Sequence, residues 1–133
     1  MPGAFTVNDT ARFRCEHVHV RVERADTPWT RAYDEGAVIE VPIAHGEGRF
    51  ECSGEVLERL VEQQRVLFRY CDADGRTTDA ANPNGSRDSV AGVLGERETT
   101  AVLMPHPERA TLPDLGTTDG QGILRGFEVA ATV

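Results

Sequence analysis

The sequence predicts a mixed α/β domain, because patterns typical of strands and of helices follow one another along a chain of one domain's length. Phe13 to Glu23 alternates apolar and polar residues, which is typical of a long strand. Ser53 precedes apolar residues at helical spacing, which predicts the start of a helix. The chain has 133 residues, 39% of them hydrophobic, and shows no linker or internal repeat. We therefore expect one globular domain, or a large piece of one.

Five strands are predicted in all. In the first, Val18, Val20 and Val22 share one face and should be buried. Met1 to Thr10 carry turn chemistry without periodicity and are expected to form a lead-in loop. Apolar runs predict the other four strands, of which the last two form a hairpin across residues 95–99; they cover residues 38–44, 65–71, 89–94 and 100–104.

Helices are expected at three places. The helix that Ser53 caps should bury the stripe formed by Val56, Leu57, Leu60 and Val61. An earlier short helical piece should begin with Pro28 at its first position and end at Gly36, with Trp29 in the core.

The third helix is expected to be capped by Asp119. Its glycines weaken it, so packing must hold it in place. Val129 falls off its apolar stripe and is expected in the tail. The stripe comprises Gly120, Ile123, Leu124 and Phe127.

The charge balance excludes two classes of partner. Acidic residues number 22 against 14 basic ones, for a net charge of −8. Nucleic acids and anionic membranes require a concentrated basic face, so neither is expected as a partner. Every basic residue is arginine. A lysine-free acidic surface suits a halophile, because concentrated salt screens carboxylate repulsion, although GC-rich coding would produce the same bias.

Targeting and cysteine patterns predict a cytoplasmic protein. No stretch approaches the roughly 18 apolar residues of a membrane span, and residues 1–4 lack the features of a signal peptide. Three cysteines without framework spacing favour reduced thiols over disulfides. Cys15 and Cys71 lie in predicted strands and should pack there as small hydrophobic residues.

The strongest chemical signal is at the end of the last predicted strand. There Pro105 and Pro107 bracket His106 and end the pairing, and Glu108 follows. His106 and Glu108 project on the same side of an extended backbone, so the carboxylate can orient the imidazole while its other nitrogen faces a cleft. This is two thirds of a catalytic triad. The residues alone allow equally a loop histidine capped by an acid.

Other polar motifs have both a structural and a chemical interpretation. His17 and His19 could bind a metal from one strand face, but no third ligand is near, and solvated histidines fit better. Residues 72–75 contain Asp-x-Asp-Gly, yet they lack the remaining calcium ligands and predict a tight turn. The glycine-rich residues 45–49 predict either a hairpin turn or a loop that approaches a ligand. A phosphate cradle is a poor alternative there, because Glu47 would repel phosphate.

Several segments together resemble a known family. His106 to Glu108 resembles the His-Pro-Glu signature of class I glutamine amidotransferases, and residues 104–109 are similar to its purine-pathway form. Further segments resemble, in order, the glutamine-hydrolysing subunits of phosphoribosylformylglycinamidine synthase. These segments are residues 42–50, 68–72, 82–86 with 90–92, and 115–116 before 119–120, so nearly the whole chain is covered.

The resemblance implies a flavodoxin-like, partly parallel sheet flanked by helices, with antiparallel hairpins in this portion. It also implies a nucleophilic cysteine on a tight strand-to-helix turn, which none of the three cysteines matches. Cys52 comes nearest but lacks the glycine before it. The start of the chain is similar to the segment that follows this turn in the family. We therefore expect residues 1–133 to be the C-terminal portion of a single amidotransferase domain that lacks the nucleophile.

The resemblance further implies the chemistry and the partners. Glutamine is hydrolysed to glutamate and ammonia, with His106 transferring protons and Glu108 orienting it. The ammonia serves the ATP-dependent conversion of formylglycinamide ribonucleotide to the amidine. ATP and magnesium belong to a synthetase subunit, which assembles with a small accessory subunit, and this chain needs no cofactor or metal. Active-site or interface loops are expected at His45, Gly46, Glu47 and Gly48, and at Asn82, Asn84, Gly85 and Ser86.

Two expectations remain open from the sequence. The loop at residues 82–86 should lie at the same sheet end as His106 or along its approach. Without a nucleophile the chain alone should be inactive, and the rival interpretation is a non-catalytic module that docks on the synthetase.

Overall fold

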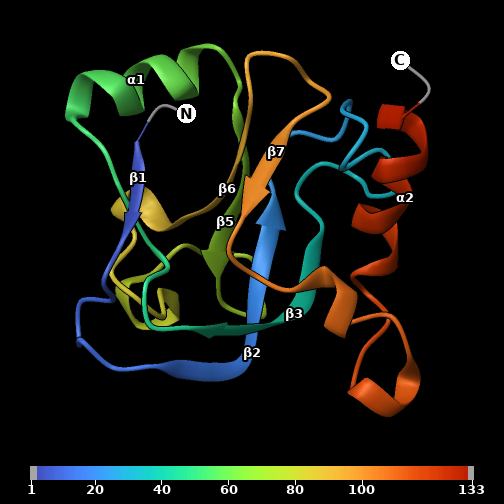
Figure 1. Cartoon of the computed structure of the whole chain (residues 1–133), viewed down its shortest axis with the longest axis horizontal. Coiled ribbons are helices and arrows are strands. Elements are labelled where there is room, and N and C mark those ends of the chain that lie inside the picture. The colour runs from blue at the N-terminus through green and yellow to red at the C-terminus, as the bar shows by residue number, and fades with distance from the viewer. Residues whose placement is uncertain (1–2, 132–133) are drawn as a thin grey trace.

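The computed structural model describes residues 3–131, apart from the side chains of residues 129–131. Its main element is a five-stranded sheet in the order β3-β2-β5-β6-β7 (Figure 1). A second sheet pairs β1 (Ala4–Thr6) with β4 (Arg49–Glu51). The strands of the main sheet are β2 (Arg14–Val22), β3 (Val38–His45), β5 (Val66–Cys71), β6 (Val90–Leu94) and β7 (Ala101–Leu103).

All five predicted strands are present, with small shifts at their ends. Val18, Val20 and Val22 are buried, which confirms the face assigned to them. The last two strands form the predicted hairpin, with Leu94 opposite Ala101. The α/β class with antiparallel hairpins is confirmed. Within residues 3–131, however, every strand pair is antiparallel, so the parallel component implied by the resemblance does not occur there.

The physical reason for the antiparallel pairing is that, in the described part of the chain, no α-helix crosses over between neighbouring strands of the main sheet. A parallel pair needs a crossover of a dozen or more residues, usually a helix, between neighbouring strands. The helix α1 (Gly54–Glu62) instead joins β4 to β5, which belong to different sheets.

The predicted lead-in loop is wrong for residues 4–6 and confirmed for residues 7–10. Ala4 to Thr6 form β1, which pairs with β4 so that Phe5 lies opposite Phe50. Their ring centroids are 5.6 Å apart. A strand of three residues is too short to show a periodicity, and its partner is distant in the chain. The Met1 and Pro2 part of that prediction lies outside the described residues.

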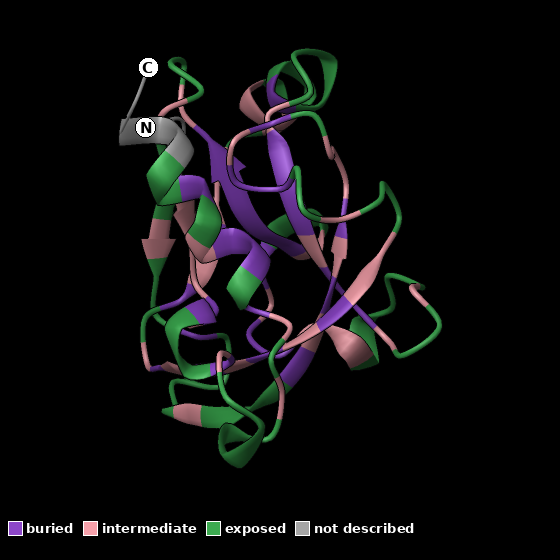
Figure 2. Cartoon of the chain, turned by 90° about the vertical axis from the view of Figure 1, so that its right-hand side faces the viewer, coloured by how far each residue is buried: buried purple, intermediate pink, exposed green. Residues whose placement is uncertain are grey.

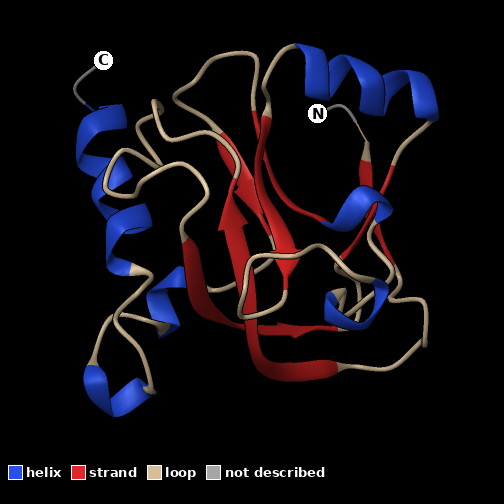
Figure 3. Cartoon of the chain, turned by 180° about the vertical axis from the view of Figure 1, so that it is seen from behind, coloured by secondary structure: helices blue, strands red, loops and turns tan. Residues whose placement is uncertain are grey.

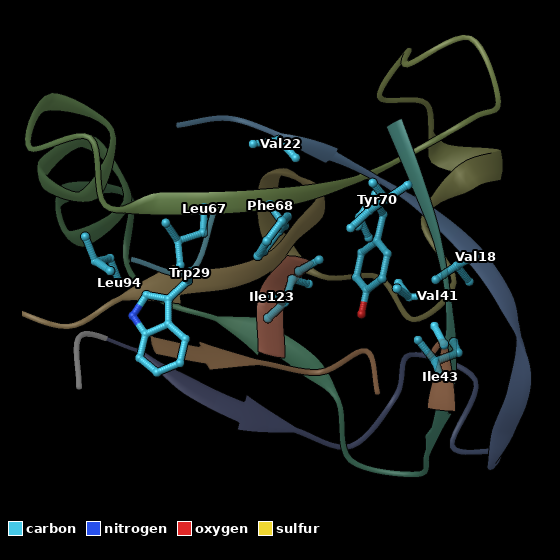
Figure 4. Close-up of a cluster of buried hydrophobic side chains, with 14 residues drawn as sticks. Val18, Val22, Trp29, Val41, Ile43, Leu67, Phe68, Tyr70, Leu94 and Ile123 are labelled. Carbon is cyan, nitrogen blue, oxygen red and sulfur yellow. The ribbon is translucent and has the colours of Figure 1, made fainter. Parts of the chain in front are cut away.

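The main sheet curls around the larger core, so that its two edge strands approach each other. Figure 4 shows this core, with Trp29 and Ile123 packed among side chains of the strands. Just after β7, the backbone N–H of His106 donates to the carbonyl of Pro42 in β3 at 2.8 Å. This bond links the end of one edge to the other. Proline is tolerated at position 42 because β3 is an edge strand.

Helix α1 begins as predicted. The Ser53 hydroxyl accepts a hydrogen bond from the N–H of Val56 at 3.2 Å, and Leu60 is buried. Val61, predicted on the apolar stripe, is 49% exposed. The short helix packs on a second, smaller core, and only a narrow face that includes Leu60 contacts it. Figure 3 shows α1 and the second long helix, α2 (Gln121–Ala131), on opposite sides of the molecule.

The predicted helical piece between Pro28 and Gly36 is wrong, because the chain forms successive turns there. The buried hydroxyls of Thr27 and Thr30 bond to each other at 2.6 Å, and such tertiary burial overrides the local helix signals. Trp29 lies in the core as predicted, and its indole N–H donates to the carbonyl of Glu98 at 2.9 Å.

Helix α2 is held by packing, as the sequence predicted. A Cβ on Gly122 would lie 2.5 Å from Cζ of Tyr33, and one on Gly126 would lie 2.8 Å from the Pro28 carbonyl oxygen. The helix therefore packs through its glycines. Figure 2 shows buried and exposed residues alternating along it. Two predictions are wrong. Val129 belongs to the helix, and Asp119 does not cap it but accepts a hydrogen bond from the N–H of Glu40 at 2.9 Å.

Short 3-10 turns complete the fold, and none of the helices in residues 3–131 is long and apolar enough to cross a membrane. The predicted loop at residues 111–118 contains one such turn and a bridge between Leu112 and Thr117. The turns are η1 (Asp79–Ala81), η2 (Arg87–Ser89), η3 (Pro107–Arg109) and η4 (Pro113–Leu115).

Candidate active site

A cavity of about 700 Å³ opens where the two edges of the curled sheet meet. Part of the lining comes from β7 and the η3 turn, and another part from the end of β3 and the turn that follows it. Apolar residues of α2 and Trp29 form the rest of the lining. The polar side chains that line the cavity are His45, Glu47, His106 and Glu108.

The predicted pair of His106 and Glu108 is formed. Nδ1 of His106 lies 2.6 Å from Oε1 of Glu108, and the side chains are 32% and 55% exposed. The two prolines end β7 and start the η3 turn, which turns both side chains toward the cavity. The bond from the His106 backbone to Pro42 fixes where the turn sits. Nε2 of His106 has no hydrogen-bond partner among the residues that the structure describes, so this nitrogen is available to a ligand.

A carboxylate on Nδ1 has two consequences for the imidazole. It holds the hydrogen on Nδ1 when the ring is neutral, which leaves Nε2 as the base. It also stabilises the imidazolium that forms when Nε2 takes a proton. The pair is therefore built for general acid-base chemistry, and the cavity supplies room for a substrate.

The loop at residues 45–48 lies against the same cavity, and its histidine is in a different environment. His45 is only 8% exposed and sits between Asn8 and Asn84. Burial is the largest factor that lowers the pKa of His45, and the positive charges of His106 and Arg14 add to it. His45 is therefore neutral near pH 7.

The loop at residues 82–86 approaches the cavity only through His45. Asn84 contacts the His45 ring at 3.5 Å, whereas Asn82, Gly85 and Ser86 do not line the cavity. Asn82 folds the loop by accepting bonds from the N–H groups of Gly85 and Ser86 at 3.0 and 3.2 Å. Of the two loops that the sequence singled out, only the first faces the cavity.

The three cysteines lie away from the cavity, and none has the features of a nucleophile. Cys52 does follow a strand and precede α1, but burial raises the pKa of its thiol, and its φ is not positive. Burial also raises the pKa of Cys71, to about 11. Cys15 is exposed, which contradicts the prediction that it packs as a small hydrophobic residue. Its position on β2 faces away from the core, since the valines occupy the other face.

Within residues 3–131, no group of three His, Cys, Asp or Glu side chains could hold a metal ion. His17 is exposed on β2, as its polar face predicted. Asp72 and Gly75 close a tight turn, in which the N–H of Gly75 donates to the carbonyl of Asp72 at 3.0 Å. The turn interpretation of this segment is confirmed.

Several residues around the cavity carry no local sequence signal. Asn8 falls in a segment without periodicity, yet it is buried against His45. Trp29, Ile123 and Phe127 line the cavity although they are far from His106 in the chain. Their apolar character predicted burial, but only the curled sheet determines which cavity they face.

Comparison with known proteins defines the class of protein. The sequence model of one protein family, the CobB/CobQ-like glutamine amidotransferase domain, matches residues 2–116. The chain belongs to this family. It is also 72% identical, over 126 residues, to phosphoribosylformylglycinamidine synthase subunit PurQ of Natronomonas pharaonis, and 68% identical over 126 residues to that of Halobacterium salinarum.

The match covers 95% of this chain and 56% of each of these two relatives, so the chain spans about half the length of the curated relatives that it matches. A solved structure, that of PurLQS from Thermotoga maritima, superposes with a TM-score of 0.79 at 34% identity. It matches over 98% of this chain and 54% of the other. The two relatives come from halophiles, which supports the halophile interpretation of the acidic, lysine-free composition.

Proposed function

We propose that the chain is part of the glutaminase subunit of phosphoribosylformylglycinamidine synthase in a cytoplasmic purine-synthesis complex. The complete subunit hydrolyses glutamine to glutamate and ammonia. The ammonia is used for the ATP-dependent conversion of formylglycinamide ribonucleotide to formylglycinamidine ribonucleotide. The family match and the names of the relatives support this proposal.

The chain's own contribution is the proton chemistry. A cysteine thiolate outside residues 1–133 attacks the amide carbon, and Nε2 of His106 delivers a proton to the leaving ammonia. The same nitrogen then takes a proton from the water that hydrolyses the thioester. Glu108 keeps the ring oriented and stabilises its charged form. The single observation that carries this assignment is the 2.6 Å contact between His106 and Glu108 at the mouth of a large cavity.

The partners in this proposal are protein chains and small molecules. The PurLQS structure that resembles this chain supports assembly with a synthetase and a small accessory subunit. We assign ATP and magnesium to the synthetase and no cofactor to this chain. The net charge of −8 supports protein partners over nucleic acid.

The test compares three proteins in a glutaminase assay with the synthetase and its substrates. The 133-residue chain alone should show no activity above background, since it lacks the nucleophile. The complete subunit should be active, and His106→Ala in it should lower kcat by about 10²- to 10⁴-fold. Synthesis of the amidine from added ammonia should persist in every case. If the 133-residue chain is active and Cys52→Ser abolishes this, the nucleophile has been placed wrongly.

A second candidate is a non-catalytic module that docks on the synthetase. The observation that favours it is the position of the three cysteines, none of which lines the cavity. Under this alternative, the complete subunit would bind the synthetase and leave glutamine unhydrolysed. The coding sequence upstream of Met1 discriminates directly, because the alternative requires it to lack a cysteine on a strand-to-helix turn.

A further inference from the structure

His45 is an unusual histidine for the wall of an open cavity, because amides hold both of its ring nitrogens. Nδ1 lies 3.1 Å from Oδ1 of Asn8, and Nε2 lies 3.5 Å from Nδ2 of Asn84. The ring is 8% exposed and still lines the cavity that His106 faces. A buried polar group of this kind is stabilised only if both of its nitrogens find suitable partners.

The orientation of both amides follows from their other bonds. Nδ2 of Asn8 donates to the carbonyls of Arg12 and His45, each at 2.8 Å, so its Oδ1 faces the ring. Oδ1 of Asn84 accepts from the hydroxyl and the N–H of Ser86 at 2.7 and 3.1 Å, so its NH₂ faces Nε2. The ring therefore carries its hydrogen on Nδ1 and accepts at Nε2. A second ring hydrogen would point at an NH₂ group, which disfavours the imidazolium.

The same two asparagines also hold the glycine turn that follows His45. The N–H of Asn8 donates to the Gly46 carbonyl at 2.9 Å, and its Oδ1 accepts from the N–H of Gly48 at 3.2 Å. Nδ2 of Asn84 donates to the Gly48 carbonyl at 2.9 Å. A Cβ on Gly48 would lie 2.5 Å from atoms of the His45 ring. The ring thus fills the space beneath the turn, and ring and turn keep each other in place.

We propose that His45 is a positioning residue, whose neutral ring between Asn8 and Asn84 fixes the turn at residues 46–48 as part of the wall of the glutamine site that His106 faces. The inference rests on the proposed glutaminase function and adds to it a residue that does not itself transfer protons. Glu47, at the tip of the turn, lines the cavity only while the turn keeps this position.

The test uses the complete subunit assembled with its synthetase. His45→Ala removes the ring, and Gly48→Ala displaces it while leaving its chemistry intact. Both should raise the KM for glutamine about tenfold or more and change kcat by less than about threefold, because they disturb the binding wall and not the proton transfer. His45→Asn keeps a donor near the position of Nδ1 and should recover most of the affinity. Gly54→Ala, whose Cβ would lie 3.6 Å from the Arg87 side chain, is the matched control and should behave as wild type.

Two outcomes would overturn the inference. One is an unchanged KM in His45→Ala and Gly48→Ala while the wild-type subunit hydrolyses glutamine. The other is a fall in kcat of a hundredfold or more with a shifted pH profile, which would make His45 a proton-transfer group. An inactive wild-type subunit would instead contradict the proposed function. If Gly48→Ala melts below the assay temperature, the KM and kcat of His45→Ala are compared with those of His45→Asn instead.

A measurement that needs no activity checks the tautomer. Ring ¹⁵N chemical shifts of the complete subunit near pH 7 should show His45 neutral, with its hydrogen on Nδ1. A protonated His45, or a hydrogen on Nε2, would contradict the hydrogen-bond assignment on which the positioning role depends.

Discussion

The two histidines that line the cavity come from different elements and differ in the partners they have. His106, just before the η3 turn, is a third exposed and bonds a carboxylate through Nδ1. His45, the last residue of β3, is almost buried and lies between two amides. A carboxylate stabilises the imidazolium, so it suits a group that gains and loses protons. Two amides with fixed orientations stabilise one neutral tautomer, so they suit a group that stays in place.

The hydrogen-bond partners of a histidine, more than its presence in a cavity, determine whether it can gain and lose a proton. The two parts of the cavity lining also differ in what holds them in place. Several hydrogen bonds among three loops hold the wall that contains His45. The wall with His106 depends on two prolines, one backbone bond to Pro42 and the packing of α2. Three substitutions test whether this distinction is correct.

The largest effect is expected when His106 receives the kind of partner that His45 has. Glu108→Gln in the complete subunit replaces the carboxylate by an amide and removes the charge that stabilises the imidazolium. Glutamine should still bind, whereas kcat should fall by about 10²- to 10⁴-fold. Steady-state kinetics of the complex measure both quantities. Glu58→Gln, on the exposed side of α1, controls for the loss of one negative charge. Similar rates for wild type and Glu108→Gln would show that the carboxylate does not support His106.

An intermediate effect is expected from filling the close contact behind the His106 wall. Gly122→Ala places a methyl group 2.5 Å from the Tyr33 ring, so α2 must move or the ring must shift. The chain should lose about 1–3 kcal/mol of unfolding free energy, as overpacked cores do. Thermal or urea unfolding measures this loss. Gly54→Ala introduces the same methyl group without a close contact and should lose nothing. Equal stability of the two variants would mean that α2 does not rely on this contact.

The smallest effect is expected from giving His45 the kind of partner that His106 has. In the wild type, the pKa of His45 is lowered in the fold from 6.5. The unfolded chain therefore binds a proton more readily, and the stability contributed by His45 is present above about pH 6.5 and is lost as the pH falls below it. His106 and Arg14, both basic, are the charged groups that act on His45.

Asn84→Asp turns the group at Nε2 into an acceptor, which favours the protonated ring. This variant should therefore lose less stability than wild type between about pH 7 and about pH 5.5. Urea unfolding across this range measures the difference. His45→Asn, which has no titrating group at this position, should show an equally flat response. A decline as steep as that of the wild type in both variants would assign the pH dependence to another residue.

The five strands of the main sheet, the first helix and the pair of His106 and Glu108 could be predicted from the sequence, because each depends on residues that are neighbours in the chain. Alternation, a capping serine and two prolines around a histidine act over a few residues and need no distant partner. The segment from Pro28 to Gly36 shows the limit of such signals. Its helix signals were present, yet the bond between Thr27 and Thr30 and the burial of Trp29 favoured turns.

Which elements meet depends on the packing of the whole chain. The three-residue strand β1 exists because β4 pairs with it, and no local pattern could reveal that. The cavity exists because the sheet curls until His106, just beyond β7, bonds Pro42 in β3, which is distant in the chain. The same curl brings Asn8 and Asn84 to His45 from distant loops. The sequence specifies the chemical group of each side chain. Its burial and its partners determine its charge state, and both depend on how the whole chain packs.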